Sequence, residues 1–149
     1  MKQIFKSLII ILMFLSTADC TAQYTGQRIF KSKFPTEIKD YNQDTYIKID
    51  NACSGCNDII VAVESISLEK VVQHAYIKAG DTYEFKNIPL GTYVCKYMWT
   101  DSFGRKHYEK DEKTMEFGRD QYGGYIITME QTLSGNLLQE DISENEFFD

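Results

Sequence analysis

The sequence predicts an all-β protein, a single antiparallel β-sandwich of about seven to eight strands. Three observations support this prediction. Short apolar runs alternate in polarity or consist of β-branched residues, and turn residues separate these runs at short spacing. The composition, with 10 Tyr, 9 Phe and only 2 Pro, favours an ordered, β-rich chain. No stretch combines the length and apolar spacing of an amphipathic helix.

Residues 81–99 are predicted to form the β-hairpin on which the other strands assemble. Residues 82–86 and 92–99 alternate between apolar and polar side chains, so each run presents one apolar face. Pro89 fixes its φ angle and donates no ladder hydrogen bond, and Gly91 permits the geometry of a return turn. We therefore expect two paired strands joined by a Pro-x-Gly corner.

The other elements follow from the same patterns in chain order. Residues 23–43 are polar with scattered aromatic side chains, and we expect a leader that lies across the sandwich or adds an edge strand to it. The sandwich domain is expected at residues 44–142 and an acidic tail at 143–149. Residues 140–149 carry five acids and no base, so we expect them to be solvated. The further strands are expected at residues 46–50, 59–63, 71–78, 114–117, 125–129 and 137–142.

The N-terminus has the pattern of an export signal. Lys2 and Lys6 precede an uninterrupted apolar run at residues 8–15, and a polar stretch follows at 16–19. A retained membrane helix needs roughly 20 apolar residues, far more than this run provides. We therefore predict a cleaved signal peptide at residues 1–22 and an exported protein that is periplasmic or secreted.

Two processing sites compete within this segment. Small residues before Gln23 favour cleavage after Ala22, which would release a soluble protein. Alternatively, Cys20 is a candidate for lipidation, which would tether the domain as an outer-membrane lipoprotein. Asp19 stands where a lipoprotein signal has a small residue, so soluble export is the first interpretation.

Charge excludes two classes of partner. The formal net charge is −6, and removing Lys2, Lys6 and Asp19 with the signal makes it −7. Nucleic acids and anionic membrane surfaces both bind basic patches, so we expect this acidic protein to bind neither of them directly. Association with a membrane is expected only if Cys20 is lipidated.

The cysteines support several interpretations. Cys53 and Cys56 are separated by two residues within a turn, and in an oxidising compartment a disulfide between them is the first. Cys95 is expected on the inward face of its strand, as a small buried hydrophobe or as a partner of either turn cysteine. A zinc site formed by these three cysteines and His74 would need separate elements to converge.

The hairpin region also resembles a known family. The strand at 83–85, the corner at 88–91 and the return strand at 91–95 resemble the transthyretin-like sandwiches, which include carboxypeptidase regulatory-like domains. The match covers residues 58–100. Residues 125–148 are similar to small exported proteins of the Bacteroidetes. The resemblance implies an Ig-like sandwich in an exported bacterial protein, and it carries over no catalytic residue.

These observations predict a non-catalytic binding or accessory module at the bacterial cell envelope. Its expected partners are proteins or carbohydrates, no cofactor is expected, and no flanking pattern of a hydrolase is present. Loops at the ends of a sandwich are frequent binding surfaces, and aromatic side chains there stack on sugars or anchor protein partners. The candidate aromatic residues are Trp99, Phe103, Tyr108 and Tyr122.

Two alternatives remain open. One is a structural lipoprotein that is anchored to the membrane through Cys20. The other is a thiol-redox or metal-binding protein that uses Cys53, Cys56 and Cys95.

Overall fold

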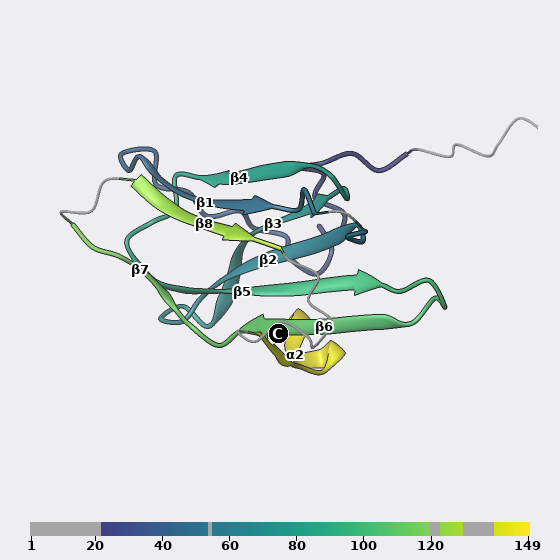
Figure 1. The fold of residues 1–149 in the computed structure, drawn as a ribbon. Coiled ribbons are helices and arrows are strands. Elements are labelled where there is room, and N and C mark those ends of the chain that lie inside the picture. The colour runs from purple at the N-terminus through teal and green to yellow at the C-terminus, as the bar shows by residue number, and fades with distance from the viewer. Residues whose placement is uncertain (1–21, 54, 120–122, 130–138) are drawn as a thin grey trace, which may run out of the picture.

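The computed structural model describes residues 22–53, 55–119, 123–129 and 139–149, which are mostly β. Figure 1 shows how the elements of this part of the chain are arranged. In chain order they are β1 (Thr45–Asp50), β2 (Ile59–Ser65), β3 (Lys70–Ile77), β4 (Thr82–Lys86), β5 (Gly91–Thr100), β6 (Lys106–Asp111), β7 (Met115–Phe117), β8 (Gly123–Thr128), β9 (Gln139–Asp141) and α2 (Glu144–Phe148).

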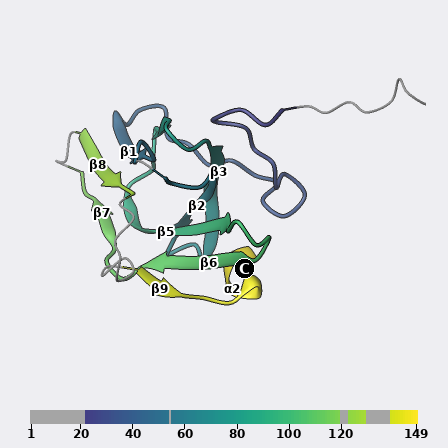
Figure 2. The same cartoon turned by 45° about the vertical axis from the view of Figure 1, so that its right-hand side comes forward.

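The strands form two sheets that share one core. The smaller sheet has the order β4-β1-β8, and the larger has the order β3-β2-β5-β6-β9, with β7 also paired to β5 (Figure 1, Figure 2). Ile47 and Phe85 of the smaller sheet lie in the same buried cluster as Val61 and Tyr97 of the larger sheet. The prediction of an all-β, sandwich-like protein is confirmed.

The smaller sheet is mixed, so the prediction of a wholly antiparallel sandwich is wrong. β4 runs antiparallel to β1, but β8 runs parallel to β1, with Tyr125 opposite Ile47. The chain reaches β8 from β7, which belongs to the larger sheet, and this crossing allows the parallel direction. A Cβ atom at Gly124 would overlap the carbonyl oxygen of Tyr46, so glycine is needed where β8 approaches β1.

The predicted hairpin at residues 81–99 is also wrong, although both of its strands exist. β4 pairs with β1 and β5 pairs with β2, so the two strands belong to different sheets. The chain crosses between the sheets at the corner, where Asn87 has a φ angle of 57° and Ile88 is fully buried. The apolar faces of both strands still point inward, because the two sheets share one core.

β6 is the strand that the sequence did not predict. Its residues are mostly charged and show no apolar alternation. It forms by pairing with the long strand β5, with Tyr108 opposite Met98 and His107 opposite Trp99. The described chain therefore has nine strands instead of seven or eight.

The leader pairs with the edge of the larger sheet. The Gly26 N–H donates to the Tyr76 carbonyl oxygen at 2.8 Å, and the Tyr76 N–H donates to the Gln27 carbonyl oxygen at 2.9 Å. The leader then crosses the outer face of this sheet, where Phe34 is buried. The exposed edge of β3 is thus covered by main-chain hydrogen bonds.

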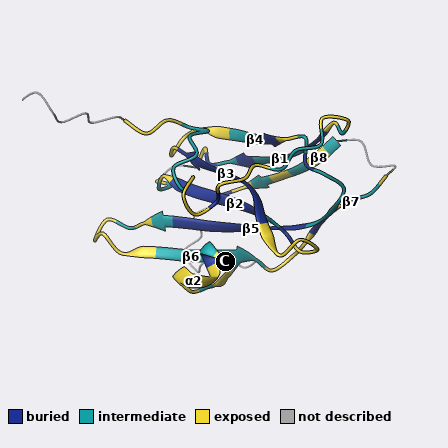
Figure 3. Cartoon of the chain, turned by 180° about the vertical axis from the view of Figure 1, so that it is seen from behind, coloured by how far each residue is buried: buried dark blue, intermediate teal, exposed yellow. Residues whose placement is uncertain are grey.

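The C-terminal residues cover the same outer face. The side chain of Ser143 accepts a hydrogen bond from the Glu146 N–H and caps α2, which lies beside β6 (Figure 3). Phe147 of this helix is fully buried. The expectation that residues 140–149 are solvated is therefore wrong for Phe147. Burial of its apolar ring is favourable, and the acidic side chains around it can remain in solvent while the ring is buried. A second buried cluster results, composed of Phe34, Ile60, Ala62, Val71, Tyr76, Met98 and Phe147.

Candidate functional site

The turn between β5 and β6 is organised by Asp101. Its Oδ1 accepts hydrogen bonds from the N–H groups of Phe103 and Arg105, both at 2.9 Å. Its Oδ2 lies 2.8 Å from Arg105 Nε and 3.1 Å from His107 Nε2. Burial alone would raise the pKa of Asp101, but the hydrogen bonds from His107, Arg105 and Phe103 outweigh it and hold the pKa well below its usual range. The turn is therefore held by a carboxylate that is ionised at neutral pH.

This turn presents two predicted aromatic residues. The Trp99 ring stacks on His107, with centroids 5.2 Å apart and an interplanar angle of 11°. Phe103 is 82% exposed at the tip, with the Arg105 guanidinium 5.3 Å from its ring centroid. An exposed ring that a hydrogen-bonded turn holds in place loses little conformational entropy when a partner covers it.

Beside this turn lies a cavity of about 670 Å³. It forms where the leader, the turn that contains Cys53 and Cys56, and the end of β5 meet, so Trp99 and Cys56 line one space. At its wall, the Tyr76 hydroxyl donates a short hydrogen bond to Asp58 Oδ2, and Asp58 Oδ1 accepts from the Ala79 N–H at 2.8 Å. The lining residues are Gln23, Ile29, Phe30, Cys56, Asn57, Asp58, Ile60, Tyr76, Ala79, Met98, Trp99 and Thr100.

A disulfide closes the turn on one side of this cavity. Cys53 and Cys56 are joined, with their Cα atoms 5.4 Å apart. The buried side chain of Asn51 donates from Nδ2 to the carbonyl oxygens of Asn57 at 3.0 Å and Lys78 at 3.1 Å. The sequence does not distinguish Asn51 from the other turn residues around it. Only the fold shows that its side chain holds two loops together.

The remaining candidate ligands of a zinc site lie apart. Cys95 is buried in the core between the sheets, whereas His74 lies against Phe34 on the outer face of the larger sheet. Burial raises the pKa of the Cys95 thiol well above its ordinary value, so the thiolate is strongly disfavoured. Within the residues that the structure describes, no group of three metal-ligating side chains gathers.

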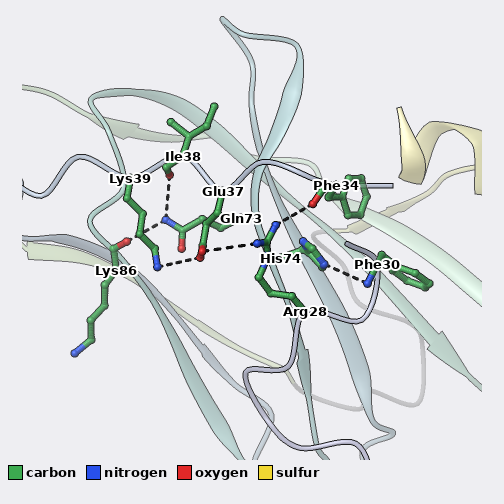
Figure 4. A network of polar contacts seen from close by, with 9 residues as sticks. All are labelled: Arg28, Phe30, Phe34, Glu37, Ile38, Lys39, Gln73, His74 and Lys86. Carbon is green, nitrogen blue, oxygen red and sulfur yellow. Dashed lines mark hydrogen bonds and ion pairs between the residues drawn. The ribbon is translucent and has the colours of Figure 1, made fainter. Parts of the chain in front are cut away.

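His74 anchors the leader as a neutral ring (Figure 4). Its Nε2 accepts a hydrogen bond from the Phe30 N–H at 3.3 Å, and Arg28 donates from Nη2 to the Phe34 carbonyl oxygen at 2.8 Å. Burial, with the nearby charges of Arg28 and Lys31, lowers the pKa of His74 to about 4, although the charge of Glu37 opposes this shift. The imidazole is therefore uncharged at neutral pH.

This arrangement predicts that acid destabilises the fold through His74. The unfolded ring has a pKa near 6.5, above the folded value of about 4, so stability falls as pH decreases between these values. Burial raises the pKa of Asp111 to about 6, so this carboxyl group makes the fold more stable as pH decreases. A variant without the imidazole of His74 is therefore needed to separate the contribution of His74 from that of Asp111. Going from about pH 7.5 to about pH 5 should cost wild type about 2 kcal/mol more than His74→Gln, as measured by urea unfolding. Equal pH dependence in both proteins would contradict this prediction.

The other predicted site residues are elsewhere. Tyr108 packs on Phe147 at a centroid distance of 5.6 Å, on the outer face of the larger sheet, whereas the Trp99 side chain packs against the core cluster on the opposite face. Tyr122, Cys20 and the predicted signal peptide lie outside the described residues. The structure thus brings Trp99, Phe103 and Cys56 to one end of the sandwich, whereas Tyr108 is not among the residues that line the cavity.

Comparisons with known proteins add no relative: neither a protein-family model, a curated protein nor a solved structure matches the chain. The described part of the chain contains no helix that is long and apolar enough to cross a membrane.

Proposed function

We propose that this protein is an exported, non-catalytic binding module of the bacterial cell envelope, related to the transthyretin-like sandwiches. The observation that carries the proposal is the cavity of about 670 Å³ beside the rigid β5–β6 turn. Pockets that combine apolar walls with a few fixed polar groups are the usual binding sites of proteins. We refer to this cavity and the tip of the β5–β6 turn together as the turn site.

The polar groups of the turn site favour binding over catalysis. Asp58 is occupied by the Tyr76 hydroxyl and the Ala79 N–H. Burial, with the Asp58 hydrogen bond, raises the pKa of Tyr76 to about 12, so its hydroxyl remains a donor at neutral pH. Groups fixed in this way recognise a ligand without exchanging protons with it.

A protein is the partner that the turn site favours. Phe103 and Arg105 project together from the tip, and aromatic and arginine side chains dominate the energetics of protein interfaces. A carbohydrate would stack on an exposed ring as well, and the experiment below separates these two partners.

Photo-crosslinking in the native host tests the turn site. A photoreactive phenylalanine analogue replaces Phe103 in one variant and Tyr41 in the matched control, since these rings are 82% and 81% exposed. We expect a discrete adduct from position 103 that is absent from position 41. The mass of the adduct distinguishes a protein from a glycan. Equal labelling at both positions, or none at 103, would refute the turn site.

Export and processing are tested by the intact mass of the mature protein from its host. Among the described residues, the leader makes its first hydrogen bond to the rest of the fold at Thr25, whose Oγ1 donates to Asp81 at 2.5 Å, just after the predicted cleavage. We expect a chain that begins at Gln23 and lacks two hydrogens for one disulfide. A chain that begins at Cys20 with acyl groups would instead support the tethered lipoprotein, and free thiols at Cys53 and Cys56 would support the redox or metal alternative.

A further inference from the structure

We infer that the free edge of β8, with the cleft beside it, binds an extended peptide strand that carries a basic side chain. This second site lies near β7, at the opposite end of β5 from the turn site (Figure 1). It extends the proposed function to a second surface that shares no residue with the first. Three features carry the inference: an unpaired strand edge, the lack of charge on that strand, and a carboxylate in the cleft.

The first feature is the edge itself. Among the described residues, β8 pairs with β1 alone. The Met129 N–H donates to the Asp50 carbonyl oxygen at 2.9 Å, and the residues that bond in a parallel ladder alternate along the strand. The N–H and C=O groups of Ile126 and Thr128 therefore point away from β1. These are the groups that an added strand would pair with.

The second feature is that β8 lacks the devices that protect the edge strands β3, β4 and β9. β3 is covered by the leader, β4 carries the Glu84–Lys86 ion pair, and β9 carries Glu140 and Asp141. β8 consists of Gly, Tyr, Ile and Thr residues only, and Ile126 is 63% exposed. Exposed uncharged edges pair readily with extended chains, so proteins that do not use them normally block them.

The third feature is a cleft of about 380 Å³ beside this edge. Asp111 is the one carboxylate among the described residues that line it. Its Oδ2 accepts from the Tyr97 hydroxyl at 2.9 Å, its Oδ1 lies 3.5 Å from Gln139 Nε2, and the Cys95 N–H also donates to the carboxylate. Burial raises the pKa of Asp111 to about 6, and a cation near Oδ1 would stabilise the ionised form. The lining residues are Asp111, Lys113, Thr114, Met115, Tyr125, Ile126, Ile127, Thr128 and Gln139.

The geometry and the charge together define the partner. Side chains alternate across a strand, so alternate residues of an added strand would point to the side of Tyr125 and Ile127, into the cleft. A lysine or arginine at one of these positions would approach Asp111, with apolar residues on either side against Met115. The net charge of −6 also favours a basic segment. Lys113 lies in the same cleft, and its positive charge would repel a basic ligand. A variant without this charge should therefore bind such a ligand more tightly.

Calorimetry with a defined peptide tests the inference. The probe is Thr-Val-Thr-Lys-Thr-Val-Thr, blocked at both ends, and its matched control has glutamine in place of lysine. We expect the lysine peptide to bind roughly tenfold more tightly at neutral pH. Asp111→Asn should abolish this difference, whereas Lys113→Gln should increase it. Equal affinity of wild type for the two peptides, or no binding of either, would overturn the inference.

The backbone contribution is tested separately. Two peptides with N-methyl groups on complementary sets of alternate residues should differ. The peptide whose methyl groups face β8 should not bind, and the peptide whose methyl groups face solvent should bind as the unmethylated peptide does. Ile126→Pro removes an outward N–H without touching the β1 ladder and should also abolish binding, while Ile126→Thr should retain it. If both N-methylated peptides bound as well as the unmethylated peptide, strand pairing would be rejected, even if the Ile126→Pro variant does not fold. Self-association of the wild-type chain through β8, seen by ultracentrifugation, would show instead that a second copy occupies the edge.

Discussion

Replacing Phe147 by alanine should lower the free energy of unfolding by about 3–5 kcal/mol. The ring is fully buried on the outer face of the larger sheet, where it contacts Phe34, Tyr108 and Phe148 with centroids 5.0–6.2 Å apart. Its removal leaves a void between α2 and the strands beneath it, and the aromatic packing is lost as well. Urea unfolding followed by tryptophan fluorescence measures the change.

The neighbouring ring supplies the control. Phe148 is partly exposed and contacts Phe30 and Phe34 at the border of the same cluster, so Phe148→Ala should have a smaller effect. A loss below about 1 kcal/mol for Phe147→Ala would mean that the C-terminal residues do not dock on the sheet in solution.

Removing the carboxylate of Glu64 should cost about 3 kcal/mol of stability. Lys96 is only 3% exposed, and its Nζ lies 3.0 Å from Glu64 Oε2 while it donates to the Glu146 carbonyl oxygen at 2.6 Å. In Glu64→Gln the ammonium group stays buried without its counter-charge, which is why the loss is large. Thermal and urea unfolding of the variant measure it.

A double variant separates the buried charge from the packing of the side chains. Glu64→Leu combined with Lys96→Met removes both charges and keeps apolar volume, so its stability should return to within about 1 kcal/mol of wild type. If Glu64→Gln were as stable as wild type, the pair would be hydrated in solution and Lys96 would not be buried.

The strand positions were predictable because they depend on local pattern. Residues 46–50, 59–63 and 71–78 alternate or are β-branched, and β1, β2 and β3 lie there. β6 was not predictable, since a charged strand forms only when a long neighbour such as β5 offers unpaired main-chain groups. The pairing of β4 with β1 was missed for a similar reason: a Pro-x-Gly corner marks a change of direction and does not specify which sheet receives the next strand.

The candidate sites divide in the same way. Trp99, Phe103 and the two turn cysteines were identified from residue type and from their place in turns or at the end of a strand. Asn51 and Asp111 were not, because their roles arise from contacts with segments distant in the chain. Tyr108 was assigned to the aromatic surface, but its ring packs on Phe147 and does not line the cavity.

The sequence by itself determined the class of the fold, the places of the described strands other than β6, and the inward faces of β4 and β5. These properties depend on side-chain periodicity over a few residues, which the chain carries locally. Only the tertiary structure decided the partner of each strand, the parallel direction of β8 and the burial of Phe147. Those depend on which apolar surfaces remain uncovered once the sheets have packed, and that is a property of the whole molecule. The edge of β8 that no described strand pairs with, beside the carboxylate of Asp111, belongs to this second kind.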